Sequence, residues 1–139
     1  MFIGEKPSLY FKKHPEKKSL GNYNTDTPAD KFFREYIKKF FEVAYATDMV
    51  KQEGLPEANF KTEWYKEPLY KDVLSTEIKK LKPKAIGLMS KKVEELFNSE
   101  FPEYRKIATY ISHPAYIVRY GKKSRWDQEF YDLKLLSNI

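Results

Sequence analysis

Apolar residues follow two alternating patterns along this chain. Short aliphatic runs predict buried strands, and longer stretches with apolar residues three or four positions apart predict amphipathic helices. In chain order the expected elements are a strand at residues 1–3, a helix at 28–41, a strand at 43–47, a helix at 69–81, a strand at 85–89, a helix at 90–98, a strand at 107–111 and a helix at 124–136. This alternation predicts a small α/β domain with a mostly parallel sheet, because each parallel strand is reached through a helical crossover.

Two long stretches follow neither pattern. Residues 9–27 and 52–68 are interrupted by proline and glycine, so we expect irregular segments there. In the second stretch, Trp64 and Tyr65 are the expected anchors to the core.

The composition narrows the classes of protein that this chain can represent. With 139 residues, of which 41% are apolar, residues 1–139 are expected to form one globular domain. The absence of cysteine excludes disulfides, thiol catalysis and cysteine-bound zinc or iron–sulfur sites. The opening segment has no signal-peptide pattern, and no apolar run approaches the roughly twenty residues of a membrane span. We therefore expect a soluble, cytoplasmic monomer without a membrane partner.

The formal charge of +6 is unevenly distributed. Basic residues gather at 12–18 and at 119–125, and aromatic residues lie among or beside them. This combination suits a nucleic-acid backbone. An ordinary solvated surface explains each segment alone at least as well.

Each expected strand ends in a polar turn. The turns are 4–8, 47–48, 89–90 and 112–114. The carboxyl ends of parallel strands meet at one edge of a sheet, where ligands bind in open α/β folds. Glu5, Lys6, Asp48 and His113 are therefore expected to meet in one crevice. The alternative for His113 is that it only caps a turn.

Four segments carry a resemblance to a known family. FIGEKPS, YATDMVK, LKPKAIGLMSKKVEELF and SHPAYIVR resemble, in order and spacing, the motifs of the uracil-DNA glycosylase superfamily. The similarity is to the branch that reads GEAPG in its first motif and HPS or HPA in its last, and it extends from about Phe2 to Leu136. It implies a three-layer α/β/α fold with a four-stranded parallel sheet in the order 2-1-3-4. It also implies hydrolysis of the N-glycosidic bond of uracil, or of another deaminated base, in DNA.

The resemblance also implies roles for individual residues. His113, as a neutral imidazole, would donate a hydrogen bond to O2 of the leaving base, where negative charge develops; this needs no metal and no cofactor. Glu5 would act as the base or as the electrostatic partner of the cationic sugar. Tyr23 is the first candidate to stack on the base extruded from the DNA, with Tyr10 and Phe11 as the others. The residues expected to line the base pocket are Gly4, Lys6, Pro7, Ser8, Tyr23, Asp48, Ser90 and Pro114.

The chain departs from the family pattern at several positions. Lys6 stands where relatives carry Asp, Asn or Ala, and a protonated lysine cannot accept a hydrogen bond from water. Asp48 stands where relatives use Asn, whose amide both donates to and accepts from the uracil edge. Either Asp48 is protonated, or the preferred base offers two donors, or the pocket does not read uracil. Without the cysteines of the iron–sulfur branch, we expect packing through Trp64 and Tyr65 to stabilise that region.

The segment after His113 corresponds to the loop that enters the DNA minor groove in this family. Ile117, Val118 and Tyr120 are the candidates for an apolar wedge, although Ile117 and Val118 suit the core equally well. The basic residues expected to contact DNA are Lys12, Lys13, Arg119, Lys122, Lys123 and Arg125.

Three functions remain open at this point. The leading one is a DNA glycosylase acting on single-stranded DNA or on a duplex with a flipped base. The second is a catalytically inactive protein of the same fold that binds nucleic acid or a protein partner. The third, an enzyme acting on a free nucleotide, has no phosphate-binding glycine loop to support it.

Overall fold

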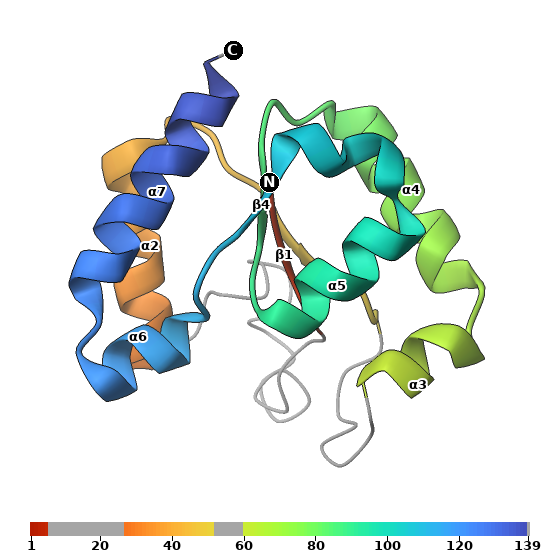
Figure 1. Ribbon diagram of the computed structural model, residues 1–139, viewed down its shortest axis with the longest axis horizontal. Coiled ribbons are helices and arrows are strands. Elements are labelled where there is room, and N and C mark those ends of the chain that lie inside the picture. Colours follow the sequence, from red (N-terminus) through yellow and green to blue (C-terminus); the bar gives the residue numbers. More distant parts are fainter. Residues whose placement is uncertain (6–26, 52–59, 139) are drawn as a thin grey trace.

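A four-stranded parallel sheet forms the middle layer of the structure (Figure 1). The computed structural model describes residues 1–5, 27–51 and 60–138. The strands are β1 (Phe2–Gly4), β2 (Ala46–Asp48), β3 (Ile86–Leu88) and β4 (Ala108–Tyr110). Their order is β2-β1-β3-β4 and every pairing is parallel. The predicted α/β class and strand order are therefore confirmed.

Helices cover both faces of the sheet. Those on one face are α2 (Pro28–Phe40), α6 (Pro114–Tyr120) and α7 (Lys123–Ser137), and those on the other are α3 (Phe60–Lys66), α4 (Leu69–Leu81) and α5 (Lys91–Glu100) (Figure 1). A short 3-10 helix, η2 (Pro102–Ile107), leads into β4. Among the helices in the described residues, none has the length and apolar character that crossing a membrane requires.

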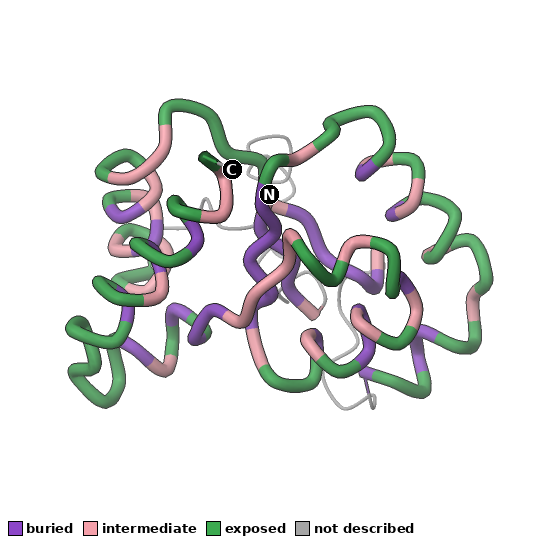
Figure 2. The backbone as a smooth tube through the Cα atoms, turned by 45° about the horizontal axis from the view of Figure 1, so that its top comes forward, coloured by how far each residue is buried: buried purple, intermediate pink, exposed green. Residues whose placement is uncertain are grey.

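Successive side chains of β1 point to opposite faces of the sheet, and the hydrophobic core therefore has two parts. Ile3 packs with residues of α4 and α5, whereas Phe2 packs with residues of α2 and α7. The ring of Phe2 lies 5.1 Å from that of Phe33 and 5.6 Å from that of Phe130. Gly87 makes room for it, since a Cβ at that position would lie 2.9 Å from a ring carbon of Phe2. Strands β1 and β3 are accordingly the buried centre of the molecule, whereas β4 at the edge of the sheet is half-buried (Figure 2).

Two helices lie in segments where no helix was predicted. Helix α6 begins directly after His113, because Pro114 occupies the first helical turn, where its missing N–H is not needed. Helix α3 lies within the stretch 52–68. Strand β2 also begins later than predicted, at Ala46, and Val43 is 89% exposed. Pro114 was interpreted only as the end of a strand, and this missed its use as the start of α6.

Trp64 and Tyr65 have different environments. Trp64 is 3% exposed, lies 6.3 Å from the ring of Phe101, and donates from Nε1 to Oε1 of Glu100 at 2.8 Å. Tyr65 is 57% exposed. Packing in the core is confirmed for Trp64. It is wrong for Tyr65, whose exposed side chain instead hydrogen-bonds to Glu100.

Candidate active site

The carboxyl edge of the sheet brings Glu5, Asp48 and His113 together. Asp48 pairs with Gly4 in the β1–β2 register, and the pairing continues as the carbonyl of Glu5 accepts from the N–H of Val50 at 2.9 Å. The negative charge of Glu5 raises the pKa of both Asp48 and His113. Glu5 therefore lies within electrostatic reach of both side chains, although the three residues come from segments far apart in the sequence.

His113 is held as a hydrogen-bond donor. It is the N-cap of α6, and its Nδ1 accepts from the N–H of Ala115 at 3.1 Å. In the neutral ring the proton is then on Nε2. The residue is exposed at the surface, but neighbouring protein atoms partly desolvate its ring, and this lowers the pKa of His113 below its ordinary value of 6.5, against the opposing charges of Glu5 and Asp30. At neutral pH the ring is thus mainly uncharged, with Nε2–H as its donor.

Ser112, which precedes His113, is fully buried and is held by α7. Its N–H donates to both carboxylate oxygens of Glu129, at 2.8 and 3.1 Å, and its hydroxyl donates to Oε2 at 3.0 Å. Its carbonyl accepts from Nε1 of Trp126 at 2.8 Å. Trp126 and Glu129 are three residues apart and share one face of α7. We call Ser112, Trp126 and Glu129 the Ser112 clamp.

The Ser112 clamp was missed by sequence reasoning, which predicted the helix at 124–136 but gave neither Trp126 nor Glu129 a role at the site. The only signal was a Trp and a Glu at helical spacing. That spacing places the two side chains on one helix face without indicating what they face.

Asp48 is a buried acid with charged neighbours. Its exposure is 4%, and burial, with further contributions from Glu77 and Glu5, raises its pKa from 3.8 to about 7, against the opposing charge of Lys51. Lys51 Nζ lies 2.5 Å from Oε1 of Glu77 and donates to the hydroxyl of Thr47 at 2.6 Å. The ammonium group of Lys51 thus interacts with the carboxyl groups of both Glu77 and Asp48. Of the three interpretations of Asp48, this environment favours the protonated acid.

Ser90 has an unusual backbone at the end of β3. It caps α5 by accepting from the N–H of Val93 at 3.2 Å, yet its φ is 147° and its ψ is 163°. This region is essentially reserved for glycine, and another residue there costs about 1–3 kcal/mol.

We expect Ser90→Gly to stabilise the protein by about 1 kcal/mol, because relief of the strain exceeds the entropy that glycine adds and the small loss of capping. Ser90→Ala keeps the strain and loses the cap, so it is expected to destabilise by about 1 kcal/mol. Urea unfolding of both variants measures the difference. A glycine variant less stable than the alanine variant would contradict the strain.

Helix α6 and the start of α7 carry the predicted DNA contacts that the structure describes. Arg119, Tyr120, Lys122 and Lys123 are exposed. The interpretation of Ile117 as a wedge is wrong for this conformation, because Ile117 is 1% exposed and packs in the core against α2 and α7. Exposed Val118 and Tyr120 remain candidates.

Two cation–aromatic pairs involve the tyrosines that flank His113 in the sequence, Tyr110 and Tyr116. The guanidinium of Arg125 lies 5.5 Å from the ring centroid of Tyr116, and Lys91 Nζ lies 4.0 Å from that of Tyr110. Tyr110 is the last residue of β4, and Tyr116 is on α6. We call the exposed residues of this region the basic surface; they are Lys91, Arg119, Tyr120, Lys122, Lys123 and Arg125.

The other pocket predictions have different outcomes. Gly4 is buried, and its carbonyl accepts from Met49 N–H at 3.0 Å; Pro114 is buried in the first turn of α6. Several predicted residues lie outside the described residues, namely Lys6, Pro7, Ser8, Tyr10, Phe11, Lys12, Lys13 and Tyr23.

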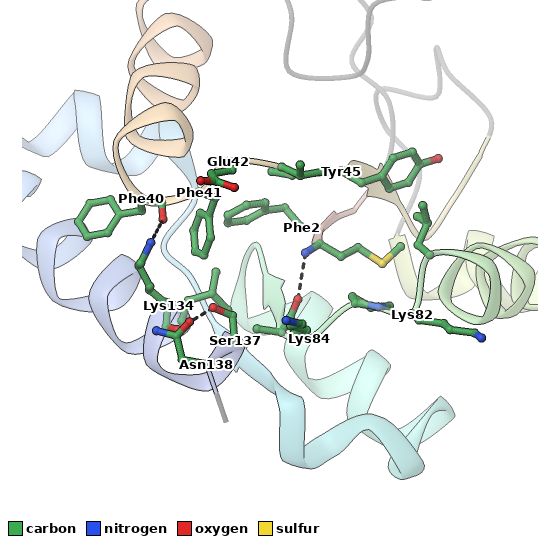
Figure 3. A pocket seen from close by; sticks show the side chains of 17 residues that line it. Phe2, Phe40, Phe41, Glu42, Tyr45, Lys82, Lys84, Lys134, Ser137 and Asn138 are labelled. Atoms are coloured by element: carbon green, nitrogen blue, oxygen red, sulfur yellow. Dashed lines mark hydrogen bonds between the residues drawn. The ribbon is translucent and has the colours of Figure 1, made fainter.

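A separate hollow of about 480 Å³ lies at the opposite, amino edge of the sheet (Figure 3). It is bordered by residues before β1, β2 and β3 and by the last turns of α7. Lys134 Nζ donates there to the carbonyl of Phe40 at 2.6 Å, and the Ser137 hydroxyl donates to the carbonyl of Lys134 at 2.7 Å. The bond from Lys134 attaches the end of α7 to α2, and the hollow is distinct from the site around His113.

The chain therefore forms a three-layer α/β/α domain. At the carboxyl edge of its sheet lie the partly exposed acid Glu5, the buried acid Asp48 and the mainly neutral His113. Within residues 1–5, 27–51 and 60–138, no group of His, Asp and Glu side chains is arranged to hold a metal ion. In three comparisons, no protein-family model, no curated protein and no solved structure matched the chain.

Proposed function

We propose that the chain is a DNA glycosylase that hydrolyses the N-glycosidic bond of uracil or of another deaminated base. The observation that carries this proposal is the state of His113, a mainly neutral ring with its proton on Nε2, at the sheet edge that also holds Glu5. The reaction needs such a donor, because the departing base gathers negative charge on O2.

The proposed reaction begins with a base extruded from the stack, at least cost when the base is damaged or unpaired. As the bond between the sugar C1′ and the base nitrogen breaks, its electron pair leaves with the base, and His113 Nε2–H stabilises the charge on O2. The sugar becomes cation-like, and the Glu5 carboxylate stabilises it. Water oxygen then bonds to C1′ and releases a proton, for which Glu5 is the acceptor.

Two features of the fold support the same proposal. The strand order β2-β1-β3-β4 agrees with the order that the resemblance implies. Ser90 has the backbone conformation of a glycine, and the L-x-P-K-x-I-x-x-L-G-x-x-A motif that this segment resembles carries glycine at that position. The backbone at Ser90 thus has a conformation that suits the glycine of the motif, although the side chain here is serine.

The proposed partner is DNA, either single-stranded or a duplex with a flipped base, bound by a monomer in the cytoplasm. The basic surface beside His113 supplies lysine and arginine for phosphates and the ring of Tyr120 for stacking. The rings of Tyr110 and Tyr116 lie beside two of its cations. Such contacts make affinity fall as salt concentration rises.

Oligonucleotides test the proposal directly. Single strands and duplexes carrying one uracil, hypoxanthine or xanthine are incubated with the protein, and abasic sites are detected by alkaline cleavage. We expect cleavage at a deaminated base and none in the matched strand with thymine or adenine. Inactivity on all three bases, by protein that still binds DNA, would refute the proposal.

The second candidate is a nucleic-acid-binding protein without catalysis. The buried acid Asp48, in place of an amide, is the observation that favours it. Salt-dependent binding of DNA without abasic products would support this candidate.

A further inference from the structure

Ser112 presents a buried backbone N–H that the sheet does not satisfy. β4 is an edge strand, and its N–H of Ile111 points to β3, where it donates to the carbonyl of Leu88 at 2.8 Å. The N–H of the next residue, Ser112, points the other way, to the open edge where no further strand lies in the described sheet. Ser112 is 0% exposed, so an unpaired N–H there would carry the full penalty of an unsatisfied donor.

Glu129 supplies the acceptor that the sheet does not provide. Its carboxylate receives the Ser112 N–H and the Ser112 hydroxyl, and Trp126 binds the Ser112 carbonyl one helical turn earlier on α7. The backbone donor and acceptor of one residue are thus both held by a single helix. Neither the peptide before Ser112 nor the peptide after it can rotate without breaking a hydrogen bond.

The residues after Ser112 restrict the orientation of the His113 ring. Pro114 fixes the backbone after His113, and Nδ1 of His113 is bonded to Ala115 N–H. With the backbone fixed on both sides and one ring nitrogen engaged, the direction of Nε2–H is determined. A donor contributes to catalysis only when it points at the position where charge develops.

We propose that Glu129 is a positioning residue, which orients His113 Nε2–H by holding Ser112 against α7. This rests on the proposed glycosylase function for its catalytic meaning, but the orientation of the ring has its own readout. Glu129 touches neither base nor sugar in this scheme and acts only through Ser112 and His113.

The test compares Glu129→Ala with Glu129→Gln. Gln retains an oxygen for the Ser112 N–H, and the Ser112 hydroxyl can turn to accept from the amide, so Gln is expected to preserve the geometry. Ala leaves the N–H without an acceptor. We expect Glu129→Ala to lower kcat for base release by about 10- to 100-fold with KM within about twofold of the wild type, as for loss of an interaction made in the transition state. Glu129→Gln is expected to stay within about threefold of the wild type.

Glu100→Ala is the matched control for general destabilisation. It also removes a carboxylate that accepts from a tryptophan Nε1, but on the other face of the sheet. We expect it to leave kcat unchanged at a temperature where both variants are folded. An equal loss of kcat in Glu100→Ala and Glu129→Ala would overturn the positioning role.

Nitrogen NMR of the imidazole separates this proposal from the proposed function. The chain has two histidines, so His113→Asn assigns the signal. We expect Glu129→Ala to change the His113 tautomer signal or its titration midpoint, and Glu129→Gln and Glu100→Ala to leave both unchanged. If the wild type releases no base but this pattern appears, the positioning role stands and the proposed function fails. An unchanged His113 signal in Glu129→Ala overturns the positioning role.

Discussion

Replacing His113 by Ala is expected to lower the rate of uracil release by about 10²–10³-fold, the usual effect of removing one preorganised donor to a developing oxyanion. The expected loss is in kcat, because the donor acts most strongly when the base carries negative charge. Single-turnover assays with excess protein measure the effect without interference from product release.

His113→Asn is the control for folding. Asn is a good N-cap, because its side-chain oxygen can accept from Ala115 N–H in place of Nδ1. The start of α6 is therefore kept. Its shorter amide does not reach the position of Nε2. We expect Asn to retain the stability of the wild type and to be nearly as inactive as Ala. Activity in His113→Asn close to that of the wild type would show that His113 only caps the helix.

Replacing Asp48 by Asn is expected to make the protein more stable above pH 7 and to leave stability unchanged near pH 3. The pKa of Asp48 is about 7 in the folded protein and 3.8 ordinarily, so the folded state binds more protons between these values. Stability from this group is therefore complete below the lower pKa and is lost as pH rises through the upper one. At roughly 1.4 kcal/mol per pH unit, the gain in Asp48→Asn reaches at most about 4 kcal/mol.

Urea unfolding of both proteins at pH 4 and at pH 8 measures this difference. Other groups, Glu129 and His113 among them, also titrate in the wild type, but they remain in the variant and cancel in the comparison. A difference between the two proteins that is the same at both pH values would contradict a protonated Asp48.

The same variant is expected to release uracil faster at pH 8. A neutral carboxylic acid offers one donor and one acceptor, as an amide does, whereas a carboxylate only accepts and repels O4 of uracil. The amide introduced by Asp48→Asn keeps its donor at every pH, so the advantage over the wild type should grow as pH rises through 7. No increase in a correctly folded variant would count against Asp48 as a reader of the base edge.

The sheet and the meeting of Glu5, Asp48 and His113 were predictable because strand direction fixes which ends share an edge. Once four strands are taken as parallel, the residue after each one is placed without knowledge of any contact. Helix α6 was missed because Pro114 ends a strand and also starts a helix, and the local pattern does not distinguish the two.

Contacts between elements could not be predicted from the sequence pattern. The bond between Glu129 and Ser112 depends on how α7 crosses the end of β4, and the pKa of Asp48 depends on burial that a sequence pattern does not measure. The burial of Ile117 likewise follows from the docking of α6 against α2 and α7. Each depends on the angle between elements rather than on the elements themselves.

Strand β1 lies in the middle of the sheet, yet its partners come much later in the chain, since Phe2 pairs with Ala46 and Gly87. A ribosome adds about 5–20 residues per second, so the second partner follows β1 by several seconds. During that time the apolar side chains Phe2 and Ile3 have no neighbouring strand on at least one side. Until residue 87 has been added, these two side chains are apolar surface that a chaperone can bind.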